Sequence, residues 1–414
     1  MENLRIDGER LWQSLMTMAE IGATEKGGVC RLALTDLDRR GRDLFVAWCR
    51  EAGCSVEVDA AGNIFARRPG RDPARPAVMT GSHLDSQPTG GKFDGAYGVL
   101  AGLEVLRSLN DLGIETEAPL ELVVWTNEEG SRFAPAMMGS GTYAGVWPLE
   151  ETLARSDGEG VTYGEALESI GYRGEGLGGR PVAAYFEAHI EQGPILEAEE
   201  KTIGVVTGAQ GQRWYEVTFT GQEAHAGPTP MARRRDALLG AARLVEAVNR
   251  IGHDFQPNAC ATVGMLHVHP DSRNVIPGRV WMTIDLRHPE DAAVDAMATR
   301  FEAEAREIAE KGGLEVEIDP IWHSPACPFA PELVEAVRSG AARGGYSHRD
   351  IVSGAGHDAV YMARVAPAAM IFVPCEDGIS HNEIENATPG DLAAGCDVLL
   401  HAMLERAGVA GERA

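Results

Sequence analysis

Basic side chains are scarce in this chain of 414 residues, which has 37 lysines and arginines against 62 aspartates and glutamates and a formal net charge of −25. Such a chain repels phosphate groups, so we expect neither nucleic acid nor an anionic membrane among its partners. The excess of acid does not exclude a small anionic substrate, because one basic side chain in a pocket can hold it.

Long apolar runs and paired cysteines are also missing. No segment approaches the roughly 20 apolar residues of a membrane-spanning helix. The first fifteen residues, MENLRIDGERLWQSL, lack the basic region and apolar core of a secretory signal. The seven cysteines are scattered and form no CxxC motif. An odd, scattered set favours reduced thiols, so we predict a cytoplasmic protein.

Apolar runs of strand length alternate with helical periodicity in the first half of the chain, and the pattern returns near the end. The predicted strands are 77–82, 120–125, 183–190 and 368–374, with helices at 95–113 and 391–408. Strands separated by helices predict an α/β layer with a largely parallel sheet. In such sheets the functional groups gather beyond the strand ends.

The middle of the chain has a different pattern. A strand with alternating polarity at 211–221 is followed by an amphipathic helix at 232–252, two strands, a second helix and a last strand. This β-α-β-β-α-β order predicts a ferredoxin-like α+β unit. We expect it to be inserted at 213–327, between the two parts, 1–212 and 328–414, of the α/β domain. A free strand edge of its sheet could pair with another copy of the chain.

Histidines and carboxylates directly follow five of these elements. The segments are GSHLDS (His83 and Asp85), GGKFDG (Asp94), NEEG (Glu128 and Glu129), EAHIEQG (His189) and GISHNE (His381). A single histidine at a strand end is more often a hydrogen-bonded core residue, and Asp94 could simply cap the helix that follows it. Because five elements supply such groups, a shared crevice is the stronger interpretation.

Three imidazoles with two of these carboxylates are more than one catalytic metal ion needs, but they suit two ions that share a bridging carboxylate. Mixed nitrogen and oxygen ligands indicate Zn, Mn, Co or Ni rather than Ca or Mg. Asp85 lies two residues after His83, and therefore on the same face if the strand continues. It would then orient the His83 imidazole from outside the ligand set.

Longer motifs carry a family resemblance. They are GSHLDSQPTGGKFDG, WTNEEGSRFAPAMMGSG, EAHIEQGP, GQEAHAGPTPM, SRNVIPG, DLRHP, GAGHDA and ISHNEIE. From about Trp12 to Ala402 the chain resembles the hydantoinase/carbamoylase group of the M20 metallopeptidase family. That group includes N-carbamoyl-L-amino acid hydrolases, β-ureidopropionases and allantoate amidohydrolases. The resemblance implies a di-metal, aminopeptidase-like catalytic domain interrupted by a dimerisation or lid domain, and hence a homodimer.

The resemblance also implies roles for single residues. One metal ion would be bound by His83, Asp94 and His189 and a second by Asp94, Glu129 and His381, with Asp94 as the bridge. Two divalent ions per subunit are therefore expected, with zinc preferred over manganese, cobalt or nickel. Glu128 matches the general base of the family.

Substrate contacts are implied in both domains. The matching positions are His225, Asn274 and Arg287 in the inserted unit and Gln192, Gly356 and His357 in the catalytic domain. Arg287 can hold a carboxylate through two charge-assisted bonds, and His225 can stabilise an oxyanion on a carbamoyl carbon. Whether His225 and Arg287 serve their own subunit or its partner stays open. Without the resemblance, these would be ordinary surface and loop residues.

The implied activity is hydrolysis of the ureido C–N bond of a small N-carbamoyl amino acid, with release of the amino acid, carbon dioxide and ammonia. The choice between α- and β-carbamoyl amino acids stays open. Allantoate amidohydrolase is the nearest rival, because it would use the same metals and base. An inactive binding or scaffold relative is the alternative from another class; it predicts the loss of a ligand or of the base, and none is missing from these motifs.

Overall fold

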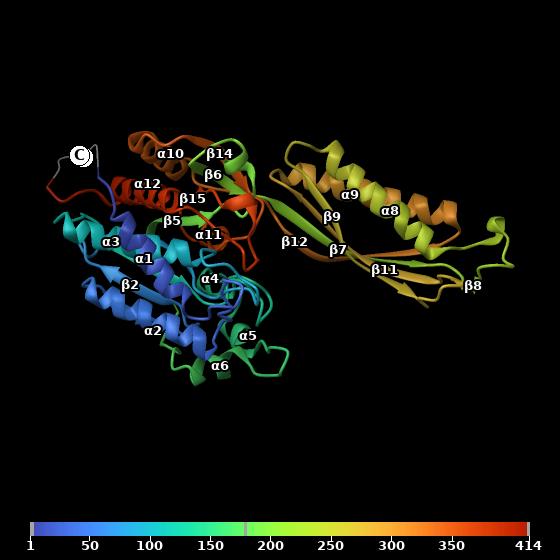
Figure 1. Ribbon diagram of the computed structural model, residues 1–414, viewed down its shortest axis with the longest axis horizontal. Helices are drawn as coiled ribbons and strands as arrows, with labels where there is room; N and C mark the ends of the chain where they lie inside the picture. The colour runs from blue at the N-terminus through green and yellow to red at the C-terminus, as the bar shows by residue number, and fades with distance from the viewer. Residues whose placement is uncertain (1–3, 178–179, 412–414) are drawn as a thin grey trace. The chain divides into compact units, whose positions relative to one another are not determined.

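The computed structural model describes residues 4–177 and 180–411, and the chain divides into two compact units (Figure 1). The first unit comprises Met1–Thr207 and Phe329–Ala414, and the second comprises Gly208–Pro328. One continuous segment therefore forms the second unit, while the first is assembled from both ends of the chain.

The first unit is built on a nine-stranded mixed sheet. Its central strands, in spatial order, are β4 (Leu120–Trp125), β3 (Ala77–His83), β5 (Val182–Ile190) and β15 (Ala368–Val373), and each runs parallel to the next. β3, β4 and β15 are buried along their whole length, which explains why they occur in the sequence as continuous apolar runs. The prediction of an α/β layer with parallel strands is confirmed for this centre.

The flanks of this sheet are antiparallel, which the strand–helix alternation does not reveal. The flanking strands are β1 (Ser55–Val58), β2 (Ile64–Arg68), β6 (Ile203–Ala209) and β13 (Cys327–Pro328), and β14 (His348–Ser353) pairs with β6. β1 and β2 are joined by a short turn rather than by a crossover helix, and such a connection forces antiparallel pairing.

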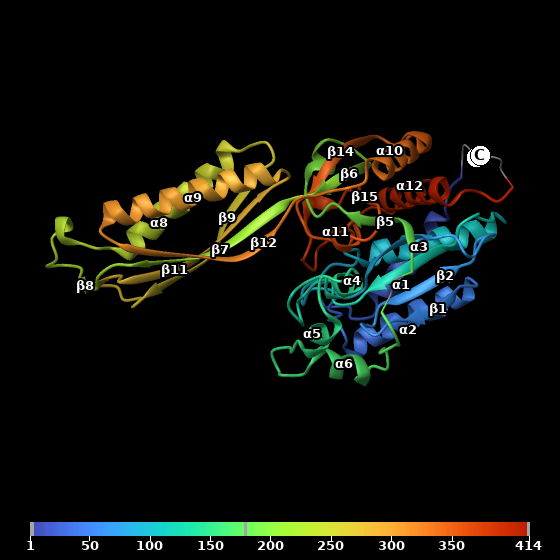
Figure 2. The same ribbon diagram turned by 180° about the vertical axis from the view of Figure 1, so that it is seen from behind.

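Helices make up much of the rest of the first unit. They are α1 (Gly8–Ala19), α2 (Asp36–Glu51), α3 (Ala96–Asp111), α4 (Met138–Tyr143), α5 (Leu149–Ala154), α6 (Tyr163–Ser169), α7 (Ile195–Ala198), α10 (Pro331–Gly344), α11 (Asp358–Met362) and α12 (Pro389–Ala407), with a 3-10 turn at Glu376–Gly378. α3 and α12 pack against β3, β5 and each other, and α10 lies beside α12 (Figure 2). Among the helices of the described residues, none combines the length and apolarity needed to cross a membrane.

The second unit has a four-stranded antiparallel sheet in the order β12 (Glu315–Ser324), β7 (Gly211–Thr220), β11 (Arg279–His288) and β9 (Cys260–His269). α8 (Ala237–Asp254) and α9 (Asp291–Gly312) pack on it through an apolar core. This is the predicted β-α-β-β-α-β arrangement. A separate two-stranded ladder joins β8 (Ala224–His225) to β10 (Val275–Ile276).

One helix boundary differs from the prediction. The helix expected from residue 232 begins at Ala237, and Met231–Arg233 forms a 3-10 turn instead. The Asp236 carboxylate accepts hydrogen bonds from the backbone N–H groups of Leu238 and Leu239, so it caps the helix at this point. The apolar periodicity does not contain this information, because the capping residue lies within a charged stretch.

Candidate metal centre

Five side chains at the ends of the central strands lie in two groups that share one carboxylate. In the first group, ligand atoms of His83, Asp94 and His189 lie within 4.8 Å of one another; in the second, those of Asp94, Glu129 and His381 do. Parallel strands present their carboxyl ends at the same edge of a sheet, and β3 and β5 bring the first two histidines to it. The fold thus brings together all five residues for which the sequence predicted metal binding.

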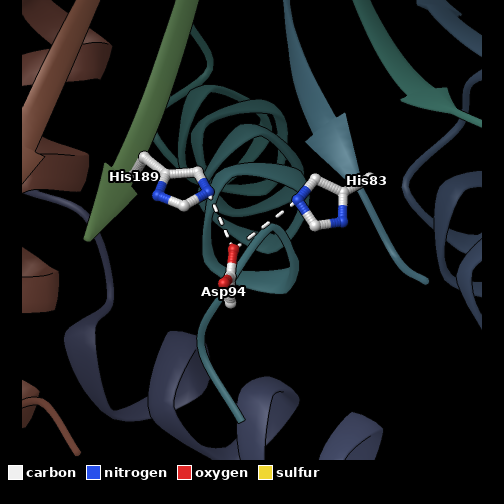
Figure 3. A group of neighbouring side chains, drawn as sticks. All are labelled: His83, Asp94 and His189. Atoms are coloured by element: carbon white, nitrogen blue, oxygen red, sulfur yellow. Dashed lines mark ion pairs between the residues drawn. The ribbon is translucent and has the colours of Figure 1, made fainter. Parts of the chain in front are cut away.

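The first group is almost completely buried, with His83 2%, His189 1% and Asp94 8% exposed. Asp94 Oδ1 lies 3.2 Å from Nε2 of His189 and 3.6 Å from Nε2 of His83 (Figure 3). The Nδ1 atoms of the two rings lie 2.8 Å and 2.9 Å from the backbone carbonyl oxygens of Asp85 and Ile190. Because a carbonyl oxygen only accepts, Nδ1 carries a hydrogen in each ring, and in its neutral form each ring presents an Nε2 lone pair to Asp94.

Lone pairs that face a carboxylate oxygen are stabilised by a cation between them. Nitrogen and oxygen ligands about 2.0–2.2 Å from a tetrahedral ion lie roughly 3.3–3.6 Å from one another. The first group has separations of 3.2 and 3.6 Å, and in the second His381 Nε2 lies 3.3 Å from Asp94 Oδ2 and 3.4 Å from Glu129 Oε2. The residues of both groups therefore fit divalent metal ions.

Crowded carboxylates make a cation favourable at this place. Burial, reinforced by the charge of Asp94, raises the pKa of Glu129 to about 7. Burial and the nearby charge of Asp358 raise the pKa of Glu128 well above its usual range. Burial also acts to raise the pKa of Asp94, but the three histidines, which donate to Asp94 when they are protonated on Nε2, outweigh burial and hold that pKa well below the usual range. Positive charge stabilises the ionised carboxylates, so metal ions compete with protons here.

Asp85 makes contacts that differ from the expected ones. β3 ends at His83, so the strand does not continue to Asp85 and the assumed shared face does not exist. The Asp85 carboxylate accepts hydrogen bonds of 3.2 Å from the backbone N–H groups of Glu128 and Glu129. The Asp85 main-chain oxygen lies 2.8 Å from His83 Nδ1, and the carboxylate Oδ1 of Asp85 lies 3.9 Å from the same atom. One residue therefore links the first histidine to the paired glutamates.

The paired glutamates have different surroundings. Glu128 Oε2 lies 3.5 Å from His83 Nε2, whereas Glu129 accepts hydrogen bonds from the Gln87 backbone N–H (3.1 Å) and side-chain amide (2.7 Å). The backbone is left-handed on both sides of the pair, with φ of 56° at Asn127 and 66° at Gly130. This turn allows adjacent side chains to face the same site, which an extended strand would not.

Two of the residues expected to bind substrate lie beside this centre. The Gln192 side-chain amide donates to Asp94 Oδ2 at 2.9 Å, and the His357 ring lies 4.5 Å from the His189 ring, centre to centre. Burial, together with the adjacent His189, lowers the pKa of His357 well below its usual range, so His357 is neutral. Gly356 precedes it in a loop, where an added Cβ atom would lie 3.0 Å from the Met137 side chain.

The remaining three substrate candidates belong to the second unit and fall into two places. His225 and Asn274 are neighbours on the β8–β10 ladder, where the Ala226 N–H donates to the Asn274 carbonyl. The Gly227 N–H donates to His225 Nδ1 at 3.1 Å, so the hydrogen of the neutral ring is on Nε2.

Arg287 lies near the far end of β11 from this ladder. Its guanidinium pairs with Asp285, with Nη2 2.7 Å from Oδ2. The DLRHP motif contains a signal for this pair, because residues two apart on a strand share a face. Asp285 was not among the predicted site residues, and neither were Gln87, Ser380 and Glu385, which contact Glu129 or Asp94 from distant loops.

Gly95 offers a test of the first group. It precedes α3 at φ 65°, and a Cβ atom there would lie 2.3 Å from the His83 ring. We expect Gly95→Ala to displace this ring and to weaken metal binding by about tenfold or more, measured as metal content against buffered free zinc. Gly113→Ala is the matched control, since Gly113 has φ 63° and nothing within 4 Å of the added Cβ. Wild-type metal affinity in Gly95→Ala would contradict the geometry of the first group.

Known proteins resemble this chain along nearly its whole length. Residues 79–405 match the model of peptidase family M20/M25/M40. The chain is 53% identical over 407 residues to the N-carbamoyl-L-amino-acid amidohydrolase of Rhizobium meliloti, covering 98% of both proteins. It is 34% identical over 409 residues to the ureidoglycolate hydrolase of Arabidopsis thaliana, covering 96% of this chain and 86% of that protein.

A solved structure agrees with this assignment. The crystal structure of an amidase of the hydantoinase/carbamoylase family from Burkholderia multivorans matches with a TM-score of 0.95 and 66% sequence identity, covering 98% of both chains. Identity this high along the whole chain extends beyond the fold to the family. The chain therefore belongs to the M20/M25/M40 peptidase family, within its hydantoinase/carbamoylase group of amidases.

Proposed function

We propose that this protein is an N-carbamoyl-L-amino-acid amidohydrolase, which cleaves the ureido C–N bond to release the amino acid, carbon dioxide and ammonia. The observation that carries the proposal is a buried acid, Glu128, next to two metal-binding groups that share Asp94. The 53% identity to an enzyme of this name supports the same substrate class.

The chemistry follows from the surroundings of Glu128. Divalent ions held by the two groups would polarise a carbonyl oxygen and lower the pKa of a water molecule. Glu128 accepts a proton from the water that attacks the ureido carbon and returns it to the leaving nitrogen, on which the electron pair of the broken bond stays. The carbamate that remains then breaks down to carbon dioxide and ammonia. Burial raises the pKa of Glu128 well above the usual range, which favours uptake of the proton because the neutral form of a buried acid is the more stable one.

Residues of the second unit would act on the two ends of the substrate. His225 Nε2 carries the ring hydrogen and would donate it to the developing oxyanion. Arg287 would hold the carboxylate, with Asp285 fixing the plane of the guanidinium.

One chain cannot offer both groups to one substrate. His225 lies on the ladder next to the Arg279 end of β11, and Arg287 lies eight residues further along that strand. An antiparallel strand rises about 3.4 Å per residue, so the two side chains are separated by roughly 27 Å. Because a carbamoyl amino acid is far shorter, we propose that His225 and Asn274 complete the site of the partner subunit in a homodimer.

The edge of the second unit has the features of a dimer interface. β9 is the last strand of its sheet and pairs only with β11 among the described residues. It exposes Met265 and Leu266, and α8, which packs against β9, exposes Leu238 and Leu239. An edge strand without charged protection tends to pair with another chain, and here a second copy would cover the apolar side chains as well.

Substrate choice tests the proposed function directly. We expect ammonia release to be fastest from N-carbamoyl-L-amino acids in a panel that also contains N-carbamoyl-β-alanine, allantoate and ureidoglycolate, with zinc, manganese, cobalt or nickel loaded. The identity to the Rhizobium meliloti enzyme, higher than that to the plant ureidoglycolate hydrolase, is the reason for this order. Faster turnover of allantoate or ureidoglycolate, or no ammonia from any compound, would reject it.

The two glutamates should separate catalysis from metal binding. Glu128→Gln removes the base but no proposed ligand, so both metal ions should remain while kcat falls about 10²–10⁴-fold. Glu129→Gln is the matched control at the adjacent position and should lose metal. Equal metal loss in both variants, or an active Glu128→Gln enzyme, would contradict the assignment.

Mixed dimers should reveal whether His225 acts across the interface. Glu128→Gln and His225→Ala subunits are produced together with different tags, and the mixed dimer is purified through both. If the partner supplies His225, one of the two sites is intact and about half of the wild-type activity returns, although each parent dimer is nearly inactive.

The control is a mixed dimer of Glu128→Gln and Glu129→Gln subunits. These residues are adjacent in one chain, so both sites stay broken and the dimer should be inactive. An inactive mixed dimer of the Glu128→Gln and His225→Ala subunits would show that His225 serves its own subunit or none.

A further inference from the structure

The loop that carries His381 contains a buried carboxylate that the proposed reaction does not use. Glu385 is 3% exposed, and its Oε1 accepts hydrogen bonds from the backbone N–H groups of Phe93 (2.9 Å) and Asp94 (3.1 Å). These donors lie in the turn before α3, whose N-cap, Gly95, has no capping side chain. Glu385 thus joins the turn that carries Asp94 to the loop that carries His381.

Gly91 leaves room for the Glu385 carboxylate because it has no side chain. A Cβ atom on Gly91 would lie 2.0 Å from the Glu385 carboxylate, closer than any side chain can approach. The glycine in the GGKFDG segment therefore allows the loop and the turn to meet.

A serine extends the contact to the bridging carboxylate itself. Ser380 Oγ lies 2.9 Å from Glu385 Oε2 and 3.0 Å from Asp94 Oδ2. The Gln192 amide donates to the same Asp94 oxygen at 2.9 Å. These contacts hold Oδ2 on the side of the second group while Oδ1 faces the histidines of the first. Rotation of the Asp94 carboxylate would break both sets at once.

The two groups depend on this contact to different degrees. In the first, both histidines stand on central strands, and backbone carbonyl oxygens hold their rings. In the second, the His381 side chain is 52% exposed and belongs to a loop residue with φ 53°. Gln87 holds Glu129, but His381 has less support of its own than the two strand histidines, and Glu385 contacts its loop through Ser380.

We propose that Glu385 is a positioning residue that, with Ser380, fixes Asp94 so that one carboxylate serves both metal positions, and that the second position depends on it more than the first. The inference rests on the proposed two-metal centre and adds a residue outside its ligand set. A different account, in which Glu385 contributes only negative charge, makes a separate prediction for its glutamine variant.

Stepwise metal titration tests the inference. Metal-free protein is titrated with zinc by calorimetry, and bound zinc is counted at each buffered free concentration. We expect Glu385→Ala to bind the first ion like the wild type and the second about 10- to 100-fold more weakly. His381→Ala removes a ligand of the second group and supplies the reference curve. Glu385→Gln keeps an oxygen that can accept from both N–H groups, so it should restore the second step.

Glu383→Ala is the matched control. It removes a carboxylate from the same loop, but this carboxylate pairs with the exposed Lys26, so the variant should leave both steps unchanged. Equal weakening of both steps in Glu385→Ala, or an unchanged second step, would overturn the inference. A Glu385→Gln variant as weak as Glu385→Ala would overturn it too, because charge rather than position would then be the cause.

Two further outcomes are possible: the Glu385→Ala variant does not fold, or the wild-type protein binds no metal. If Glu385→Ala does not fold, judged by circular dichroism, Ser380→Ala replaces it. That variant removes only the hydroxyl between the two carboxylates, and an unchanged second step in it would overturn the inference. Wild-type protein that binds no divalent ion would instead reject the two-metal centre and the proposed function with it.

Discussion

The orientation of one buried carboxylate controls the candidate metal centre. Asp94 directs Oδ1 to two histidines on neighbouring strands and Oδ2 to a histidine on a distant loop, so any rotation of the side chain affects both groups. A carboxylate in this position can bridge two ions only if its plane is held. Hydrogen bonds from Gln192 and Ser380 hold it, and they approach from loops that follow β5 and β15.

Two glycines near Asp94 allow other side chains to approach the backbone closely. Gly95 lets the His83 ring approach the start of α3, and Gly91 does the same for the Glu385 carboxylate. Asp85 holds the turn of the paired glutamates through both of its carboxylate oxygens. Each of these contacts joins the ends of two strands or loops, so they tie the site to the central sheet although most of its residues lie outside it.

The second unit adds a constraint of a different kind. A ten-residue strand, β11, separates the Arg287 end of its sheet from the ladder that carries His225 and Asn274. The rigid length of a β-strand therefore makes it impossible for one copy to surround a small substrate with all three residues. If these residues bind substrate, as proposed, the oligomeric state becomes part of the active site rather than a means of stabilisation.

The amino-acid sequence by itself determined the features that depend on local patterns. Continuous apolar runs predicted the central strands, the β-α-β-β-α-β order predicted the architecture of the second unit, and the motifs after the strands predicted the residues that the fold gathers around Asp94. The central strands are predictable because a strand that is buried on both faces of a parallel sheet must be apolar at most positions.

Only the tertiary structure decided how the gathered residues are held. Glu385 and Phe93 are 292 residues apart in sequence, and no periodicity connects them. Asp85 was expected to share a strand face with His83, but β3 ends at His83, and the Asp85 carboxylate accepts hydrogen bonds from the glutamate pair while its main-chain oxygen contacts the His83 ring. Hydrogen bonds between distant loops depend on where each loop lies in the folded chain. A sequence pattern can predict a turn, but it does not predict which distant residue that turn contacts.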